Sequence, residues 1–337
     1  MNVKRPSITE VAKIAKVSIG TVSNVLNGLP SVDPKIRSRV EKAVAQIGYV
    51  RNLGAASMRS KSNSVYGLII HDIRNPAYAQ IAHGAKLEAA KHNYKILVLS
   101  SGESLALELE NLKLFEELRL SGIILAAISD DNLEYANGIF ERGTPMVILT
   151  TQDTFRIPHV SINNELGGSL AAQQLVKLKR KNIFFVAGSL EIQAMNERFN
   201  GARSFLGDDK SIRLTHFLTE GNTLEAGIHA AQMIEKLPQK SRPTGILAGN
   251  DLIAIGIQQT LMHSETIDLR KDLSIVGFDD IEIAQLDTVA LTTIRQDFKR
   301  LGELTIQILR KLQDNTKIYD PGKLSILLDP KLIIRDS

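Results

Sequence analysis

From Val65 onward, short continuous apolar runs alternate with amphipathic stretches, and this alternation constrains the fold more than any other feature of the sequence. A strand that is apolar throughout must be buried on both faces, which occurs in parallel sheets covered by helices. The run VYGLIIH (65–71) is such a strand, and a helix is predicted from about Ala77 to His92. The other predicted strands read YKILVLS, SGIILAAI, TPMVILT, NIFFVAG, RLTHFLT, TGILAG and LSIVGF.

The second half of this region repeats the plan of the first, with helices predicted near 194–206 and 224–237 and from Asp251. Two similar α/β halves predict two lobes of doubly wound parallel sheet with a cleft between them. We therefore expect a two-lobed α/β body over residues 63–337, with the chain crossing between lobes near 161–164 and 292–296.

Polar residues follow the predicted strands of both halves, at the edge where such sheets bind ligands. This arrangement predicts a cleft for a small polar molecule. An alternative is that some of these residues only cap the next helix, and Asp251 and Asp280 are the main candidates for that role. The residues are His71, Asp72, Asn75, Tyr78, Thr150, Thr151, Asn163, Asn196, Arg198, Asn250, Asp251, Asp279 and Asp280.

Residues 1–50 follow a different, purely helical pattern. Ser7-Ile8-Thr9-Glu10 is a capping box that begins one helix, and Ser18 caps a second about three residues after the first ends. Two short helices so joined form a helix-turn-helix. Asp33 and Pro34 begin a third helix, and Gly48 ends it. The apolar positions at helical spacing are Val11, Ile14, Ala15, Val22, Val25, Leu26, Ile36, Val40, Ala43, Val44 and Ile47.

The charge of the chain is unevenly distributed. Residues 1–62 hold eleven Lys and Arg against three acids, a net +8, whereas the rest of the chain holds 30 against 34, a net −4. A basic head on a mildly acidic body indicates that the head meets a polyanion, although a basic solubilising tail would have the same charge.

The second helix of the pair is the one that enters a DNA major groove. Its predicted outward face is neutral, whereas an ordinary surface helix is rich in Glu and Lys. Neutral donors and acceptors suit base edges and phosphates. The residues of this face are Ser18, Ile19, Gly20, Thr21, Ser23, Asn24 and Asn27.

The segment ITEVAKIAKVSIGTVSNVLNG resembles the DNA-binding head of the LacI/GalR family of bacterial transcription regulators, most specifically in VSIGTVSNVLN. The resemblance continues through HDIRNPAY, VSINNELGG, NERFNGARSFL, ILAGNDLIAIG, LSIVGFDDI and ALTTIRQDF. It implies a body with the periplasmic-binding-protein fold that senses a small-molecule effector.

The resemblance assigns base reading to Ile19, Gly20 and Asn24, and phosphate or backbone contacts to Ser18, Thr21, Ser23 and Asn27. Asn24 stands where the family usually has Arg, so a preference for adenine over guanine is expected. Residues 51–62 correspond to the hinge, which forms a short helix on DNA, with Asn52 as its cap and Met58 as the apolar wedge into the minor groove. A passive flexible linker is the alternative for this segment.

The resemblance also places effector contacts on Tyr78, Asn196, Asn250, Asp279 and Gln296, with Arg198 as a further candidate. Asn196 replaces a usual Arg, and Thr150 replaces a common Asp. The cleft is therefore less charged than is usual in the family, which favours a neutral sugar or sugar-like metabolite. The implied partners are a pseudo-palindromic double-stranded DNA operator, this effector and a second copy of the chain in a homodimer.

Motifs of enzymes are absent from the sequence, which has no HExxH, no GxxxxGK[ST], no GxSxG and no cysteine. We expect no catalytic activity, no cofactor and no metal site. The start MNVKRPSITE has no apolar signal region, and no run approaches the ~20 residues of a membrane helix, so a cytoplasmic protein with no membrane partner is expected. The competing classes are a solute-binding protein without DNA function and a constitutive architectural DNA-binding protein.

Overall fold

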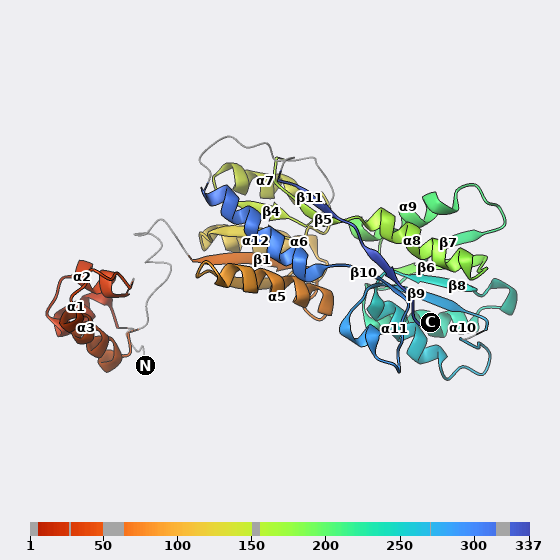
Figure 1. The fold of residues 1–337 in the computed structure, drawn as a ribbon, viewed down its shortest axis with the longest axis horizontal. Helices are drawn as coiled ribbons and strands as arrows, with labels where there is room; N and C mark the ends of the chain where they lie inside the picture. The colour runs from red at the N-terminus through yellow and green to blue at the C-terminus, as the bar shows by residue number, and fades with distance from the viewer. Residues whose placement is uncertain (1–5, 27, 50–63, 150–155, 270, 315–323) are drawn as a thin grey trace. The chain divides into compact units, whose positions relative to one another are not determined.

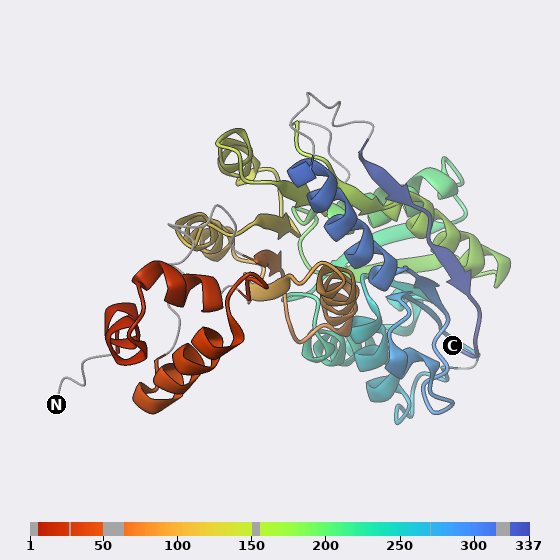
Figure 2. The ribbon, with the colours of Figure 1, turned by 60° about the vertical axis from the view of Figure 1, so that its left-hand side comes forward.

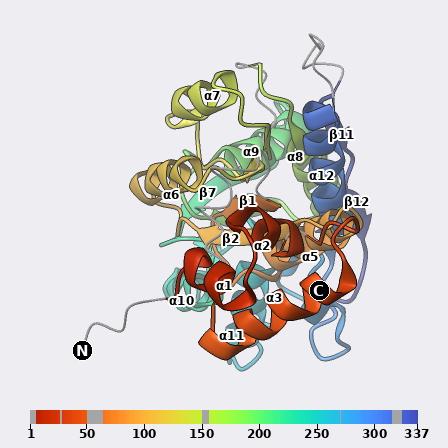
Figure 3. The same ribbon diagram turned by 90° about the vertical axis from the view of Figure 1, so that its left-hand side faces the viewer.

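The computed structural model describes residues 6–26, 28–49, 64–149, 156–269, 271–314 and 324–337. The chain separates into two compact units, Met1–Asn63 and Ser64–Ser337. The predicted hinge, 51–62, lies outside the described residues. The first unit contains α1 (Ile8–Ala15), α2 (Ile19–Leu26) and α3 (Pro34–Ile47), the red helices of Figure 3.

Short-range signals set the ends of these helices as predicted. The Ser7 backbone N–H donates to Glu10 Oε2 at 2.6 Å and the Glu10 N–H donates to Ser7 Oγ at 3.3 Å, which completes the capping box. Asp33 caps α3 by accepting from the Lys35 backbone N–H at 2.8 Å, and Gly48 ends α3 with φ 61°. These helix ends therefore satisfy their exposed backbone groups locally.

One apolar core holds the three helices of this unit together. Val11, Val22 and Val40 are completely buried in it, one from each helix. Ile14, one of the apolar positions at helical spacing that were expected to share a single seam, does not belong to this core, because it is 41% exposed. Ile14 lies to one side of the seam that Val11 and Ala15 form on α1.

The second unit begins with a lobe built on a four-stranded sheet of order β2-β1-β3-β4, in which all pairings are parallel. One core, under α5 and α12, covers one face of this sheet, and another, under α6 and α7, covers the other (Figure 1). The elements are β1 (Val65–Ile70), α5 (Pro76–Ala90), β2 (Lys95–Ser100), α6 (Leu105–Glu117), β3 (Gly122–Leu125), α7 (Leu133–Glu141), β4 (Met146–Ile148) and α12 (Phe298–Asp314).

The other lobe is built on a six-stranded sheet of order β12-β10-β9-β8-β6-β7, with α8 and α9 on one face and α10 and α11 on the other. The expectation of purely parallel sheets fails at one place, since the edge strand β12 runs antiparallel to β10. The elements are α8 (Asn164–Lys177), β6 (Asn182–Ala187), α9 (Gln193–Leu206), β7 (Arg213–Leu218), α10 (Leu224–Lys236), η1 (Gln239–Ser241), β8 (Gly245–Ala248), α11 (Asp251–Leu261), β9 (Ser274–Asp279), η2 (Glu282–Gln285), β10 (Thr293–Arg295) and β12 (Lys331–Ile333).

The chain passes between the lobes three times. It passes from β5 (Val160–Ile162) into α8, from β10 into α12, and from β11 (Ile326–Leu328) into β12. The first two passages lie where the sequence predicted them, whereas the third was not anticipated. Because of the second passage, α12 lies beside α5, far away in sequence (Figures 1 and 2). The third passage returns the chain along the sheet edge, which explains the antiparallel β12.

Reciprocal glycines allow α5 and α12 to approach closely. A Cβ atom on Gly84 would overlap the Lys299 carbonyl oxygen, and one on Gly302 would overlap that of Ile81. The pairs α8–α9 and α10–α11 meet through glycines in the same way. Since backbone atoms cannot move aside as side chains do, these positions admit no larger residue without a shift of a helix.

Candidate functional site

The face of α2 that was predicted to read DNA points away from the core of the first unit. Val22 and Val25 are buried, whereas Ile19, Gly20 and Asn24 are exposed. Ser18 accepts a hydrogen bond from the Thr21 backbone N–H at 3.1 Å and so begins the helix. Ser18 is also exposed, Thr21 and Ser23 are half-buried, and Asn27, Asn52 and Met58 lie outside the described residues.

Two arginines of the basic head hold the backbone of the helix-turn-helix. Arg39 Nη2 donates to the carbonyl oxygen of Ala15 and, at 3.1 Å, to that of Lys16, both at the end of α1. Arg37 Nη2 donates to the Leu29 carbonyl oxygen at 2.7 Å. These cations are therefore ordered against the protein, and their charge still contributes to the positive field of the head.

A cavity of about 290 Å³ opens at the carboxyl ends of the strands in both lobes of the second unit. Parallel strands place the residues that follow them at this common edge, which is why residues far apart in sequence meet here. The polar side chains of the lining are His71, Asp72, Arg74, Asn75, Tyr78, Glu103, Arg198, Glu220, Asn222, Thr223, Asn250 and Asp279.

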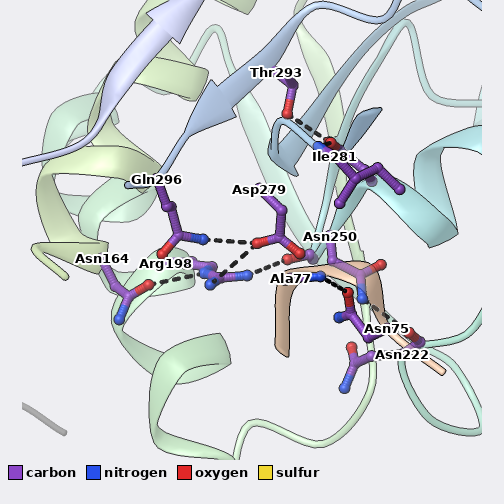
Figure 4. Close-up of polar contacts among 12 residues, drawn as sticks. Asn75, Ala77, Asn164, Arg198, Asn222, Asn250, Asp279, Ile281, Thr293 and Gln296 are labelled. Carbon is purple, nitrogen blue, oxygen red and sulfur yellow. Dashed lines mark hydrogen bonds and ion pairs between the residues drawn. The ribbon is translucent and has the colours of Figure 1, made fainter. Parts of the chain in front are cut away.

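Arg198 is the centre of the polar cluster shown in Figure 4. Its Nε donates to Asn164 Oδ1 at 3.0 Å and its Nη1 donates to the Gly249 carbonyl oxygen at 2.5 Å. The guanidinium lies 3.8 Å from the centre of the Phe278 ring, and Nη2 is 3.9 Å from Asp279 Oδ1. Burial lowers the pKa of Arg198, and the charge of Asp279 opposes that shift. These contacts fix the guanidinium in one orientation.

Asp279 ends β9 in an unusual backbone conformation, with φ 123°, and its side chain is 4% exposed. Gln296 Nε2 donates to Asp279 Oδ1 at 2.7 Å. Burial raises the pKa of Asp279 to about 7, against the opposing effect of Arg198. A carboxyl group with such a pKa can accept or donate a hydrogen bond near neutral pH, which suits the hydroxyl groups of a ligand.

Asn250 is the cap of α11, since its Oδ1 accepts from the Ile253 backbone N–H at 2.9 Å. Its Nδ2 donates to the Asn222 carbonyl oxygen at 2.8 Å, which ties two cavity loops together (Figure 4). The alternative that Asp251 caps this helix was wrong. Asp251 Oδ2 accepts from the Ile281 backbone N–H at 2.9 Å instead, and burial raises the pKa of Asp251 to about 6.

Asp280 does not cap a helix either. Its Oδ2 accepts from Arg295 Nε at 2.5 Å and its Oδ1 accepts from Arg335 Nη2 at 2.7 Å, with the carboxyl group 1% exposed. Asp280 therefore joins the end of β9 to β10 and to the chain after β12, whereas Asp279, one residue earlier, lines the cavity.

The remaining predicted effector contacts differ in their placement. Tyr78 lies on the cavity wall, 5.3 Å from the His71 ring, and burial raises the pKa of its hydroxyl. Gln296 does not line this cavity, but its side chain donates to Asp279, which does. Asn196 is exposed on α9, lines no part of this cavity, and donates through Nδ2 to the Leu190 carbonyl oxygen at 3.2 Å. Thr150 and Thr151 lie outside the described residues.

Sequence reasoning missed a contact between the lobes at the cavity. Asn222 Nδ2, from the loop after β7, donates at 3.1 Å to Glu103 Oε1, from the loop after β2. Glu103 adopts φ 60°, next to Gly102 with the same φ. Both side chains follow strands that the sequence predicts, so polar residues after those two strands are the signal that points to them.

The described part of the chain holds no group of three or more His, Asp or Glu side chains arranged to bind a metal ion. Within the same residues, no helix has the length and apolar character needed to span a membrane.

Comparison with known proteins agrees with this architecture. Residues 7–52 match the model of bacterial regulatory proteins of the lacI family, and residues 172–337 match a periplasmic binding protein-like domain. The ribose operon repressor of Bacillus subtilis (strain 168) is 31% identical over 306 residues, which cover 90% of each protein. The chain belongs to the lacI family of bacterial regulatory proteins.

Other relatives extend over nearly the whole chain. The ribose operon repressor of Haemophilus influenzae is 27% identical over 334 residues, 98% of each protein. The crystal structure of the Lac repressor dimer bound to operator and the anti-inducer ONPF has a TM-score of 0.78 and 26% identity, and the match covers 99% of each chain. This lacI-family member is therefore a DNA-binding transcriptional regulator of the repressor type, and the competing class of a solute-binding protein without DNA function is wrong.

Proposed function

We propose that this regulator is a cytoplasmic homodimeric repressor whose affinity for a pseudo-palindromic operator is controlled by a neutral, sugar-like effector. The observation that carries the proposal is the cavity of about 290 Å³ between the lobes, with Arg198 and Asp279 fixed in its wall. A ligand that contacts both lobes stabilises the arrangement of the lobes in which it makes those contacts. It therefore shifts the equilibrium between open and closed lobes, as an effector must.

The DNA contacts are assigned to the neutral face of α2. Ile19, Gly20 and Asn24 are exposed there, in position to read base edges. Phosphate and backbone contacts come from Ser18, Thr21, Ser23 and Asn27, and Asn52 and Met58 act in the hinge.

The class of effector follows from the charges and the hydrogen-bonding groups of the cavity wall. Arg74 is paired with Asp72 at 2.8 Å, and the Nε and Nη1 of Arg198 donate to protein groups, so both cations are partly neutralised by protein contacts. The amides of Asn75, Asn222 and Asn250 hold neighbouring loops, but each amide has two N–H donors and two acceptor positions, so donors and acceptors remain beside the Asp279 carboxyl group for the hydroxyl groups of a ligand. Two relatives named as ribose operon repressors agree with a sugar.

The lobes are joined by three passages of chain, so effector binding can rotate one lobe against the other without breaking either core. We propose that this rotation is transmitted through residues 51–62. A helix of that length is not stable alone, so its formation depends on contacts with DNA and with the second copy of the chain. The regulator has no catalytic role in this proposal: the adjacent Asp279 and Asp280 carboxyl groups have separate partners and do not act as a pair.

The test begins with an operator selected from random double-stranded DNA. Fluorescence anisotropy of that operator, with and without sugars that stabilise the protein thermally, is expected to show an effector-dependent Kd for wild type. Asp279→Ala is expected to abolish the effector response and to keep operator binding. Asp208→Ala, an exposed carboxylate away from the cavity, is the matched control. A normal effector response in Asp279→Ala would contradict the assignment of the cavity.

A further inference from the structure

The hydrogen bond between Asn222 and Glu103 lies at the mouth of the cavity between the lobes. A second hollow, of about 690 Å³, shares the lining residues Glu103, Ile192 and Gly221 with that cavity. Exposed side chains border this outer hollow, among them Leu218, which is 65% exposed. The bond therefore lies where the cavity meets a space that is open to solvent.

Asn222 is fixed in the lobe of the six-stranded sheet before it reaches the other lobe. Its Oδ1 accepts from the Gly188 backbone N–H at 3.1 Å, and its carbonyl oxygen accepts from Asn250 Nδ2 at 2.8 Å. The amide is thereby oriented so that Nδ2 donates to Glu103 Oε1 at 3.1 Å. Because side chain and backbone are already held, this bond costs little additional conformational entropy.

Glu103 is presented by a tight turn in the lobe of the four-stranded sheet. The Gly102 N–H donates to the His71 carbonyl oxygen at 2.7 Å, and Ser104 caps the helix α6 that follows. Between these two anchors, Glu103 adopts φ 60°. A residue other than glycine rarely adopts this conformation, and such conformations concentrate at functional sites. The turn therefore holds the carboxylate toward the opposite lobe at the expense of backbone strain.

A further contact joins the lobes inside the cavity. Burial raises the pKa of Asp279, and a hydrogen bond with the Asn75 side chain opposes that shift. Asn75 caps α5 in one lobe, and Asp279 ends β9 in the other. Because Asp279 is an assigned effector contact, a bound effector competes with Asn75 for this carboxyl group. The bond between Glu103 and Asn222 lies at the edge of the cavity, so it can persist while the effector is bound.

We propose that Glu103 and Asn222 form a latch across the mouth of the cavity, which holds the lobes together and closes the cavity over the effector. The two residues are positioning residues, because they act by contacting each other and setting the fraction of molecules with closed lobes. A hydrogen bond to a carboxylate is strong enough for this role. The inference rests on the proposed function, which makes this cavity the effector site.

The test exchanges the donor and the acceptor of the latch. Asn222→Asp places a second carboxylate against Glu103 and keeps an oxygen that accepts from the Gly188 N–H. Adding Glu103→Gln restores a hydrogen bond, now donated by the new amide to the new carboxylate. The matched control is Asn137→Asp, because Asn137 Nδ2 donates to Glu141 Oε1 at 3.0 Å within the single helix α7.

The first measurement is the rate at which a thiol inside the cavity reacts. The chain has no cysteine, so Met195→Cys, at a cavity-lining position that is 6% exposed, supplies a single thiol. Alkylation of the full-length chain by N-ethylmaleimide is expected to be about tenfold faster with Asn222→Asp. The double exchange is expected to return the rate to within about twofold of that without it, and Asn137→Asp to leave it unchanged.

Glu103→Gly removes the latch without placing two carboxylates together. Glycine adopts φ 60° without strain, so this variant keeps the turn. Alkylation is expected to be about fivefold faster, with no loss of Tm. A residue with a merely structural role would instead lower the Tm when it is removed.

The second measurement is the distance between the lobes. Glu110→Cys on α6 and Ser204→Cys on α9 place one spin label on an exposed position of each lobe. Double electron–electron resonance, with an excess of unlabelled chain so that only distances within one chain are seen, is expected to show more of the longer distances with Asn222→Asp. The double exchange is expected to restore the original distribution.

An unchanged alkylation rate or an unchanged distance distribution in Asn222→Asp would overturn the latch, as would failure of the double exchange to restore them. The proposed function would still stand, because neither measurement uses an effector or an operator. If both measurements change as expected and no sugar alters operator binding, the proposed function fails and the latch across the cavity stands.

Discussion

The Asp279 carboxyl group should make the stability of the regulator depend on pH in the direction opposite to that of an ordinary surface carboxylate. Burial raises its pKa from 3.8 to about 7 in the folded protein. The folded state therefore binds this proton more tightly than the unfolded state does. The resulting stabilisation is fully present below about pH 4 and is lost as pH rises through about 7.

The size of the effect follows from the width of that interval. One pKa unit corresponds to about 1.4 kcal/mol, so the interval of about three units corresponds to about 4 kcal/mol. Asp279→Asn removes the titration and keeps an oxygen that can accept from Gln296 Nε2. Between pH 5 and pH 8, the free energy of unfolding of the variant should rise relative to wild type by about 3 kcal/mol.

Urea unfolding of both proteins at pH 5, 6, 7 and 8 measures this difference directly. Titration of all other groups is common to the two proteins and cancels, apart from that of near neighbours. If the difference between variant and wild type is the same at pH 5 and pH 8, then Asp279 titrates near its ordinary pKa, and the argument from burial is wrong.

Three further perturbations test other parts of the molecule. Gly302→Ala places a methyl group against the Ile81 carbonyl oxygen and should lower the free energy of unfolding by about 1–3 kcal/mol in urea. Gly20→Ala is its control, because a Cβ there meets only one side-chain oxygen, at 3.7 Å, and an equal loss in both would contradict the packing argument. Asn24→Arg should shift the selected half-site toward guanine, and an unchanged selected sequence would show that Asn24 reads no base. Asp33→Ala removes the cap of α3 and should destabilise the head by about 1 kcal/mol in thermal unfolding, whereas an unchanged Tm would show that the cap is dispensable.

The helices of the head and the long apolar strands of both lobes could be predicted from the sequence because their causes lie within a few residues, whereas the three-residue strands β5, β10, β11 and β12 were not predicted. Ser7 and Glu10 are three residues apart, and Asp33 immediately precedes α3, so these contacts form in whatever fold surrounds them. A continuous apolar run such as 65–70 likewise indicates a strand buried on both faces. Ile14 and Ile36 were misplaced in the head, since neither belongs to its apolar core.

Which side chains meet in the cavity was decided by the tertiary structure. Asn196 and Arg198 are two residues apart on α9, about 200° around the helix, so only one of them can face the cavity, and local sequence does not say which. Glu103 meets Asn222 only because two sheets present their strand ends to each other.

The sequence by itself determined the helices of the head, the long apolar strands, the basic charge of the head and the polar strand ends, since helix caps and apolar periodicity act over short distances along the chain. The tertiary structure alone decided the third passage between lobes, the separate partners of Asp279 and Asp280, and the contact of Glu103 with Asn222. These features depend on which distant segments pack together, and that is fixed by burial of the whole core.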